Sequence, residues 1–239
     1  MIFAPKAPGL LELAEQALSS TTEGYDLLAE KFEYSPFCTD DEVLEPLVAA
    51  ASEHGSIGTA LDVCCGTGVV MRRLRPHCDD RVVGIDRSKG MIAEGRKLFE
   101  GADGDAPGDF VCGDALQMDF DAQFDVATCC GAFGHILEDQ QAEFAARIWS
   151  ALRPGGRFLF VTRPMPSVAS VAWLASRGFN AAMHLRNAVL KPPFIMFYLT
   201  FTLERAREVL GRNGFELEVR QPYRDTDYEA MRLVVATRG

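Results

Sequence analysis

The chain has 239 residues and a net charge of −10 at pH 7, and 48% of its residues are hydrophobic. This length fits one α/β domain that buries a full core, with room for an insert. An acidic chain is repelled by phosphate backbones, so nucleic acid is excluded as an expected partner.

The cysteines and the opening residues indicate where the protein works. The seven cysteines contain no C-x-x-C pair, so they fit neither a disulfide framework nor a zinc site, and no metal is expected. The opening stretch "MIFAPKAPGLLELAEQ" has one lysine and an apolar run broken by prolines, unlike a secretory signal. No uncharged apolar stretch reaches membrane-spanning length. We expect a soluble cytoplasmic protein.

Residues 1–55 are expected to form an N-terminal helical cap. The stretches "LLELAEQAL", "YDLLAEKFEY" and "DDEVLEPLVAAASEHG" have the periodicity of helices. Asp40 and Asp41 can cap the third helix, and Gly55 can end it.

Residues 56–239 alternate short apolar runs with helical patterns. The expected strands are 60–64, 82–85, 110–112, 124–128, 157–162, 215–220 and 232–237, and helical patterns include 69–75, 89–100, 139–152 and 203–213. This alternation predicts a doubly wound, Rossmann-like α/β fold: a seven-stranded, mostly parallel sheet with helices on both faces. Pro154, Gly155 and Gly156 are expected to end one helix and open a strand.

The stretch "LDVCCGTGVV" after the first predicted strand indicates a ligand site. Gly66 and Gly68 let the backbone turn tightly and approach a ligand closely. A dinucleotide fingerprint, G-x-G-x-x-G, requires a third glycine where this chain has Met71. Asp62 would also repel a pyrophosphate but attract a ligand that carries an amino group.

Acidic residues end three successive predicted strands. Asp62 ends the first, Asp86 the second and Asp114 the third. Asp86 stands about where an acid accepts ribose hydroxyls, and Asp114 can meet the amine of an adenine. Each alone has an ordinary structural interpretation, as an ion-pair partner, a helix cap or a turn residue. Together they predict a ligand with adenine, ribose and an ammonium but no phosphate.

These motifs resemble the class I S-adenosylmethionine-dependent methyltransferases over roughly residues 60–239. The resemblance rests on "LDVCCGTG", "VVGIDRS", "GDALQMDF", "FDVATCCGAFGHI" and "LRPGGRFLFVT". It implies S-adenosylmethionine as cofactor and methyl transfer to a small, apolar or aromatic acceptor. The cofactor-binding residues that it implies are Asp62, Cys64, Gly66, Gly68, Asp86, Arg87, Asp114, Ala115 and Cys130.

One departure from the family concerns Cys64, which stands where the family usually has glycine. The turn is therefore expected to begin one residue later or to be wider. Two other function classes stay open: a non-catalytic protein of the same fold that binds S-adenosylmethionine, and an NAD-dependent oxidoreductase, which Met71 and Asp62 disfavour.

His135 is the candidate catalytic residue, because it lies in the loop after the fourth predicted strand. It is either a base that takes a proton from an acceptor hydroxyl or a structural histidine bonded to backbone. Cys64, Cys65, Cys129 and Cys130 end neighbouring predicted strands and are expected to cluster, either as small packing residues or as a redox-sensitive site.

Residues 163–200 form an expected helical insert between the fifth and sixth strands. The segment contains four cations and no acid. Two short helices are expected, at 167–177 and 180–190. The insert is interpreted as a lid over the acceptor, with its pocket lined by Trp173, Phe194, Phe197 and Tyr198, as a peripheral membrane contact, or as core. The sequence leaves the oligomeric state open.

Overall fold

A computed structural model describes residues 7–239, so the first six residues of the expected cap 1–55 lie outside the described residues. Its centre is one seven-stranded sheet with the order β3-β2-β1-β4-β5-β7-β6, in which β7 runs antiparallel to both of its neighbours. The strands are β1 Ile57–Val63, β2 Cys78–Asp86, β3 Gly108–Cys112, β4 Phe124–Cys129, β5 Leu152–Thr162, β6 Phe215–Arg220 and β7 Arg232–Arg238. The predicted doubly wound, mostly parallel sheet is confirmed.

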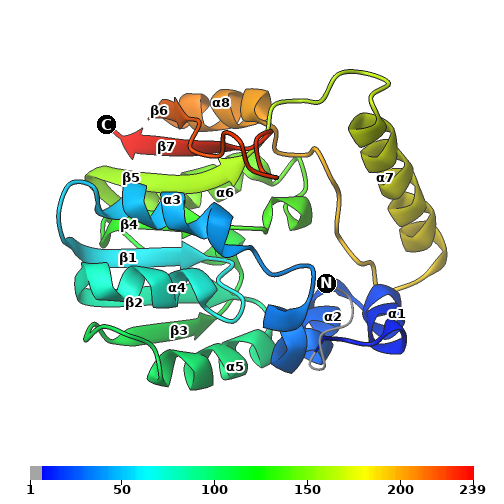
Figure 1. Cartoon of the computed structure of the whole chain (residues 1–239), viewed down its shortest axis with the longest axis horizontal. Helices are drawn as coiled ribbons and strands as arrows, with labels where there is room; N and C mark the ends of the chain where they lie inside the picture. The colour runs from blue at the N-terminus through cyan, green and yellow to red at the C-terminus, as the bar shows by residue number, and fades with distance from the viewer. Residues whose placement is uncertain (1–6) are drawn as a thin grey trace.

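The described chain has eight α-helices, five of which pack on the sheet (Figure 1). They are α1 Leu10–Leu18, α2 Thr21–Leu28, α3 Asp41–Ser52, α4 Val69–Leu74, α5 Lys89–Glu100, α6 Gln141–Ala151, α7 Val171–Val189 and α8 Leu203–Arg212. Short 3₁₀ turns cover Ala29–Tyr34, Arg75–His77, Ala115–Gln117 and Phe133–His135.

The sheet buries both faces, as its continuous apolar strands predict. Helices α6 and α8 pack on one face, where Phe144 and Val209 meet strand residues such as Leu61 and Phe158. Helices α3, α4 and α5 pack on the other, around Ala60. Side chains on β1 alternate between the two clusters, so β1 is buried from both sides and its last residues lie at the centre of the carboxyl edge of the sheet.

Two local expectations were wrong. Pro154–Gly156 do not open a strand, because β5 already begins at Leu152 and pairs with Phe124; the register then jumps to Arg157, so the three residues bulge out of the strand. The insert holds one 19-residue helix, α7, in place of two. Gly178 lies at the expected break, but one glycine without a proline costs only about 1 kcal/mol in a helix.

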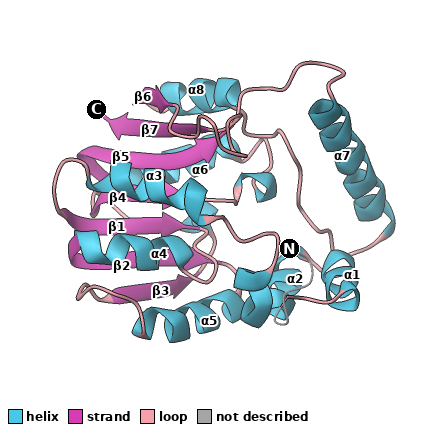
Figure 2. Cartoon of the chain, in the orientation of Figure 1, coloured by secondary structure: helices cyan, strands magenta, loops and turns pink. Residues whose placement is uncertain are grey.

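Two parts of the chain lie beyond the carboxyl edge of the sheet. Helices α1 and α2 gather there, next to the start of α5, while α7 stands apart from the sheet and is joined to it by long loops (Figures 1 and 2). Residues 191–202, which we call the strap, return from α7 to α8. Within residues 7–239, none of the helices combines the length and hydropathy needed to cross a bilayer.

The close packing behind the glycine-rich turn gives a stability prediction. A Cβ atom at Gly84 on β2 would overlap the Met71 sulfur and lie 2.7 Å from Cys65 Sγ. We expect Gly84→Ala to lower the free energy of unfolding by about 1–3 kcal/mol, as overpacking of a filled core does. Chemical denaturation measures this value.

Gly211→Ala in α8 is the matched control, because no atom lies within 4 Å of the added Cβ. It should leave stability unchanged or raise it by about 0.5–1 kcal/mol. Equal unfolding free energies for the two variants would contradict the described packing.

Candidate functional site

A cavity of about 240 Å³ lies at the carboxyl ends of β1, β2 and β4. Its floor contains strand ends and the loops that follow them, and the N-terminal cap supplies its roof. Nine of the ten residues predicted from sequence line it: Asp62, Cys64, Gly66, Asp86, Arg87, Asp114, Ala115, Cys130 and His135. Gly68 is not among the lining residues.

The turn after β1 begins at Cys64, contrary to the expectation of a later start. Cys64 adopts φ 58°, in the left-handed region where the glycine usual in the family has no steric cost. Gly66 and Gly68 follow with φ 54° and 74°. Gly68 stands immediately before α4, and a Cβ there would lie 3.0 Å from the Phe110 ring. A glycine at this position therefore allows both the turn and the close packing against Phe110.

Asp86 joins two turns at the end of β2. Its Oδ2 accepts a hydrogen bond from the Gly66 amide at 2.9 Å, and its Oδ1 accepts one from the Ser88 amide at 2.8 Å. Burial raises the pKa of this carboxyl, against the lowering effect of the amides. A carboxylate offers about four lone-pair sites, so after these amides, with that of Arg87, it can still accept a hydroxyl proton from the cavity.

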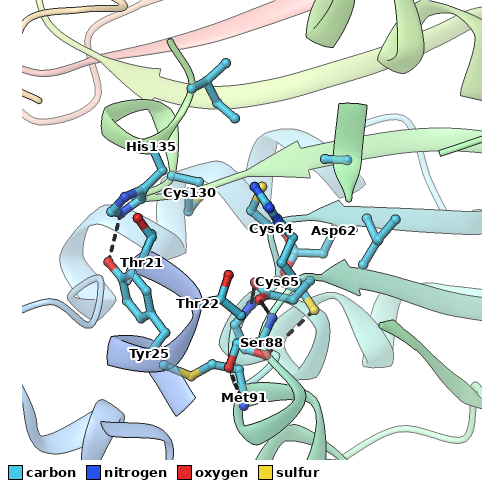
Figure 3. Close-up of a pocket in the computed structure, with 18 of the residues that line it drawn as sticks. Thr21, Thr22, Tyr25, Asp62, Cys64, Cys65, Ser88, Met91, Cys130 and His135 are labelled. Carbon is cyan, nitrogen blue, oxygen red and sulfur yellow. Dashed lines mark hydrogen bonds between the residues drawn. The ribbon is translucent and has the colours of Figure 1, made fainter. Parts of the chain in front are cut away.

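Asp62 is a buried carboxyl on the floor of the cavity. Its Oδ1 accepts a hydrogen bond from Thr128 Oγ1 at 2.8 Å, and its side chain lies near Cys64 in Figure 3. Burial and, to a smaller extent, the nearby Asp86 charge raise the pKa of Asp62 to about 7, against the lowering effect of the Thr128 hydrogen bond. A cationic group placed here would reverse this shift, because an opposite charge favours the ionised form.

Asp114 lies at the rim formed after β3. Its Oδ1 accepts a hydrogen bond from the Leu116 amide at 3.0 Å, and its Oδ2 lies 3.8 Å from an Arg87 guanidinium nitrogen. Ala115 follows it, buried, at the start of a 3₁₀ turn. Asp114 therefore both caps a turn and faces the cavity. Its interpretation as a turn residue is compatible with its interpretation as a ligand-binding residue.

The predicted cysteine cluster forms at the ends of β1 and β4. Cys64, Cys65 and Cys130 line the cavity, and Cys129 shares a hydrogen bond with Cys64. Burial raises the pKa of Cys65 and Cys130, and the hydrogen bond with Cys64 raises that of Cys129. These buried thiols stay protonated at neutral pH, which favours the packing interpretation over the reactive one.

His135 forms a pair with Tyr25 of α2 across the cavity. The Tyr25 hydroxyl lies 2.8 Å from His135 Nε2, and His135 Nδ1 lies 2.5 Å from the Ile195 carbonyl oxygen (Figure 3). A carbonyl oxygen only accepts, so Nδ1 carries the proton and Nε2 accepts from the Tyr25 O–H. Burial lowers the pKa of His135, which keeps the ring neutral.

Three side chains tie the N-terminal cap to the cavity. Besides Tyr25, Asp26 accepts hydrogen bonds from Ser88 Oγ at 2.5 Å and the Gly90 amide at 2.7 Å. Glu33 accepts from Thr67 Oγ1 at 2.8 Å and pairs with Arg72 at 2.5 Å. The lining residues that sequence reasoning missed include Thr21, Thr22, Tyr25, Phe32, Phe37 and Thr39. None belongs to a motif, so only the packing of this cap onto the sheet places them.

The insert contributes less to the cavity than expected. Ile195 of the strap lines it, whereas the four aromatic residues expected there do not. Phe194 stacks on the Tyr25 ring and Phe197 on the His184 ring, while Tyr198 is half exposed. The strap thus supports Tyr25 and His135 from behind, and α7 does not cover the cavity.

The cavity fits a cofactor with adenine, ribose and an ammonium. Three carboxyl groups reach it from three strand ends, and among the described residues neither Asp62 nor Asp86 has a lysine or arginine that offsets its charge. Buried carboxylates without a cation are costly, and a bound ammonium and hydroxyl donors would satisfy them.

Comparison with known proteins agrees with this geometry. Residues 60–156 match a family described as "Methyltransferase domain". The chain is 36% identical over 104 residues to the cyclopropane mycolic acid synthase MmaA2 of Mycobacterium tuberculosis, covering 44% of this chain and 36% of that protein. It is 33% identical over 134 residues to the ubiquinone/menaquinone biosynthesis C-methyltransferase UbiE of Roseobacter denitrificans, covering 54% and 52%. The matches therefore span only about a third to a half of these relatives.

Solved structures extend the likeness to nearly the whole chain. A complex of DhpI with SAH matches 97% of this chain and 99% of its own, with a TM-score of 0.65 and 22% identity. The N-methyltransferase NodS of Bradyrhizobium japonicum WM9 matches 81% of this chain and 93% of its own, with a TM-score of 0.58 and 16% identity. Residues 60–156 are therefore similar to a methyltransferase domain, and the solved structures show the same fold over nearly the whole chain.

Proposed function

We propose that this chain is an S-adenosylmethionine-dependent methyltransferase whose acceptor is a small apolar or aromatic molecule that carries a hydroxyl group. The observation that carries the proposal is one cavity lined by Asp62, Asp86 and Asp114 on its floor and faced by the Tyr25–His135 pair. The acids suit the cofactor, and the pair suits an acceptor that must lose a proton.

The proposed roles follow the geometry. Asp86 accepts a ribose hydroxyl through its remaining lone pair, Asp62 attracts the ammonium, and Asp114 with Ala115 borders the adenine. Gly66 lets the backbone approach the ligand. When bound, the cofactor supplies a methyl group on a sulfonium for in-line transfer to the acceptor. Alignment of the cofactor and the acceptor in the cavity accounts for most of the rate.

The Tyr25–His135 pair is proposed to move the acceptor's proton. Tyr25 gives its own hydroxyl proton to His135 Nε2, so the Tyr25 oxygen keeps lone pairs that can accept from an acceptor O–H. As the acceptor oxygen gains its methyl group, its proton passes to Tyr25 while the Tyr25 proton passes to His135. The Ile195 carbonyl holds Nδ1–H and orients the ring. His135 thus acts through Tyr25.

The rest of the lining supports an apolar acceptor. Phe32, Phe37, Leu137 and Ile195 also line the cavity, and Phe32 and Ile195 contact the pair. Two of the relatives are named for mycolic acid and for ubiquinone/menaquinone biosynthesis, which fits an acceptor of this kind. The choice of oxygen over nitrogen or carbon as the methylated atom rests on the pair alone.

Replacing Asp86 tests the cofactor. Asp86→Ala removes two acceptor oxygens, and we expect S-adenosylhomocysteine to bind at least tenfold more weakly, because hydrogen bonds to a charged group contribute about 1.5–3 kcal/mol each. Isothermal calorimetry measures the affinity, with Asp109→Ala, an exposed acid on β3, as the control. NAD should bind neither variant nor the parent. Unchanged affinity in Asp86→Ala would refute the assignment of Asp86 as the ribose acceptor.

The raised pKa of Asp62 predicts a pH dependence. Below about pH 7 the free carboxyl holds a proton that a bound ammonium displaces, so affinity for S-adenosylhomocysteine should fall as the pH drops from 8 to 6. The slope should approach about tenfold per pH unit. The Asp62→Asn variant should bind S-adenosylhomocysteine more weakly than the parent, and its affinity should depend less on pH. Parallel pH profiles for the two proteins would remove Asp62 from the binding site.

Two variants test the proton relay. Tyr25→Phe and His135→Gln should each lower kcat by about 10²-fold or more while the affinity for S-adenosylhomocysteine stays within a few-fold. Tyr198→Phe is the matched control, because its half-exposed hydroxyl lies outside the cavity lining. Normal turnover of both variants from pH 6 to 9 with a hydroxyl acceptor would return the pair to a structural role.

A further inference from the structure

Helix α7 is amphipathic, but its polar face, and not its apolar face, is turned toward the rest of the protein. Asn180 and Asn187 point toward the body of the protein, where each pairs with both the amide and the carbonyl of one strap residue, Tyr198 and Phe194 respectively, at 2.8–2.9 Å. None of the residues in α7 is buried. Its polar side is therefore the attached side.

The opposite side of α7 carries an apolar stripe with no partner in the described chain. Residues spaced by three and four along the helix lie on one face, and here they are Val171, Leu174, Ala175, Gly178, Ala182, Leu185 and Val189. Val171, Leu185 and Val189 are 84%, 68% and 72% exposed. Single exposed apolar residues are ordinary, but a contiguous stripe marks a surface that another apolar medium covers.

The positive charge of residues 163–200 indicates which apolar medium covers the stripe. Residues 163–200 carry four cations and no acid within a chain of net charge −10. Arg186 holds α1 to the strap through the Ala17, Ser19 and Pro192 carbonyls, while Arg177 and Lys191 are exposed beside the helix. Helix α1, which Arg186 contacts, adds the exposed Leu11 and Leu18, with Glu15 as its exposed acid.

We propose that α7 docks this protein on an anionic lipid surface, with its apolar stripe in the interface between head groups and acyl chains. A helix with an apolar stripe and flanking cations lies in that plane, and each cation near an anionic surface adds about fivefold to the binding constant. A second copy of the chain is a poorer partner, because a symmetric contact would place the cations of both copies together.

Vesicle flotation tests this docking with the whole chain. Vesicles of equal parts phosphatidylglycerol and phosphatidylcholine should carry the protein upward at low salt, and pure phosphatidylcholine should carry much less. Raising the salt to about 0.5 M should release most of the protein, because it screens the charges. Protein that stays below both kinds of vesicle at low salt would overturn the proposal.

A pair of matched variants separates the stripe from net charge. Ala182→Glu on the stripe should weaken vesicle binding at least tenfold, and Leu185→Glu likewise, since each places a charge where the acyl chains meet the helix. Ala93→Glu, an equal change at an exposed position of α5, should bind within twofold of the parent. Both positions on α7 are exposed, so folding survives, which circular dichroism checks.

The same variants distinguish the alternative occupant. Equal losses for Ala182→Glu and Ala93→Glu would mean that only net charge matters, and the stripe would have no role. A dimer of the parent in light scattering that Leu185→Glu converts to monomers, without vesicle binding by either, would assign the stripe to a second copy. Either result would overturn lipid docking through the stripe of α7 while leaving the proposed methyl transfer untouched.

Discussion

The carboxylate of Asp86 holds the site together, because it bonds to both of the turns that form the cavity floor. It accepts from the Gly66 amide after β1 and from the Ser88 amide after β2. Ser88 Oγ then caps α5 at the Met91 amide and donates to Asp26 of α2. Asp86, which is half-buried, thus fixes two strand ends, one helix start and, through Ser88, the N-terminal cap.

The same buried acids work against stability. The Asp86 charge disfavours ionisation of Asp62, the Asp26 charge disfavours ionisation of Asp86, and burial opposes ionisation of both. An apolar residue in place of Asp62 would relieve this cost, so the presence of Asp62 is explained by a ligand that brings the missing positive charge. The left-handed Cys64 adds backbone strain at the same place. The strained backbone and the uncompensated carboxylates therefore lie together at the cavity, where a ligand can bind.

Sequence predicts the floor of this site far better than its roof. Asp62, Asp86 and Asp114 follow apolar strands, and a parallel sheet brings the ends of such strands to one edge, so their meeting needs no knowledge of side-chain packing. Tyr25 and Ile195 reach the cavity from segments whose position depends on contacts 110 and 60 residues away along the chain. No local periodicity encodes such contacts.

Helix α7 illustrates a further reason why sequence predicts the residues above the cavity less well than the strand ends below it. Its apolar spacing predicts helical structure, though in two helices where the chain forms one, and the expected lid would have required its apolar side chains to face the acceptor. Two asparagines prevent that orientation, because their paired hydrogen bonds to the strap backbone fix which face turns inward. The strap that they hold also carries the Ile195 carbonyl that orients His135. The strap therefore supports both α7 and the Tyr25–His135 pair, and a displacement of α7 would also change the position of His135.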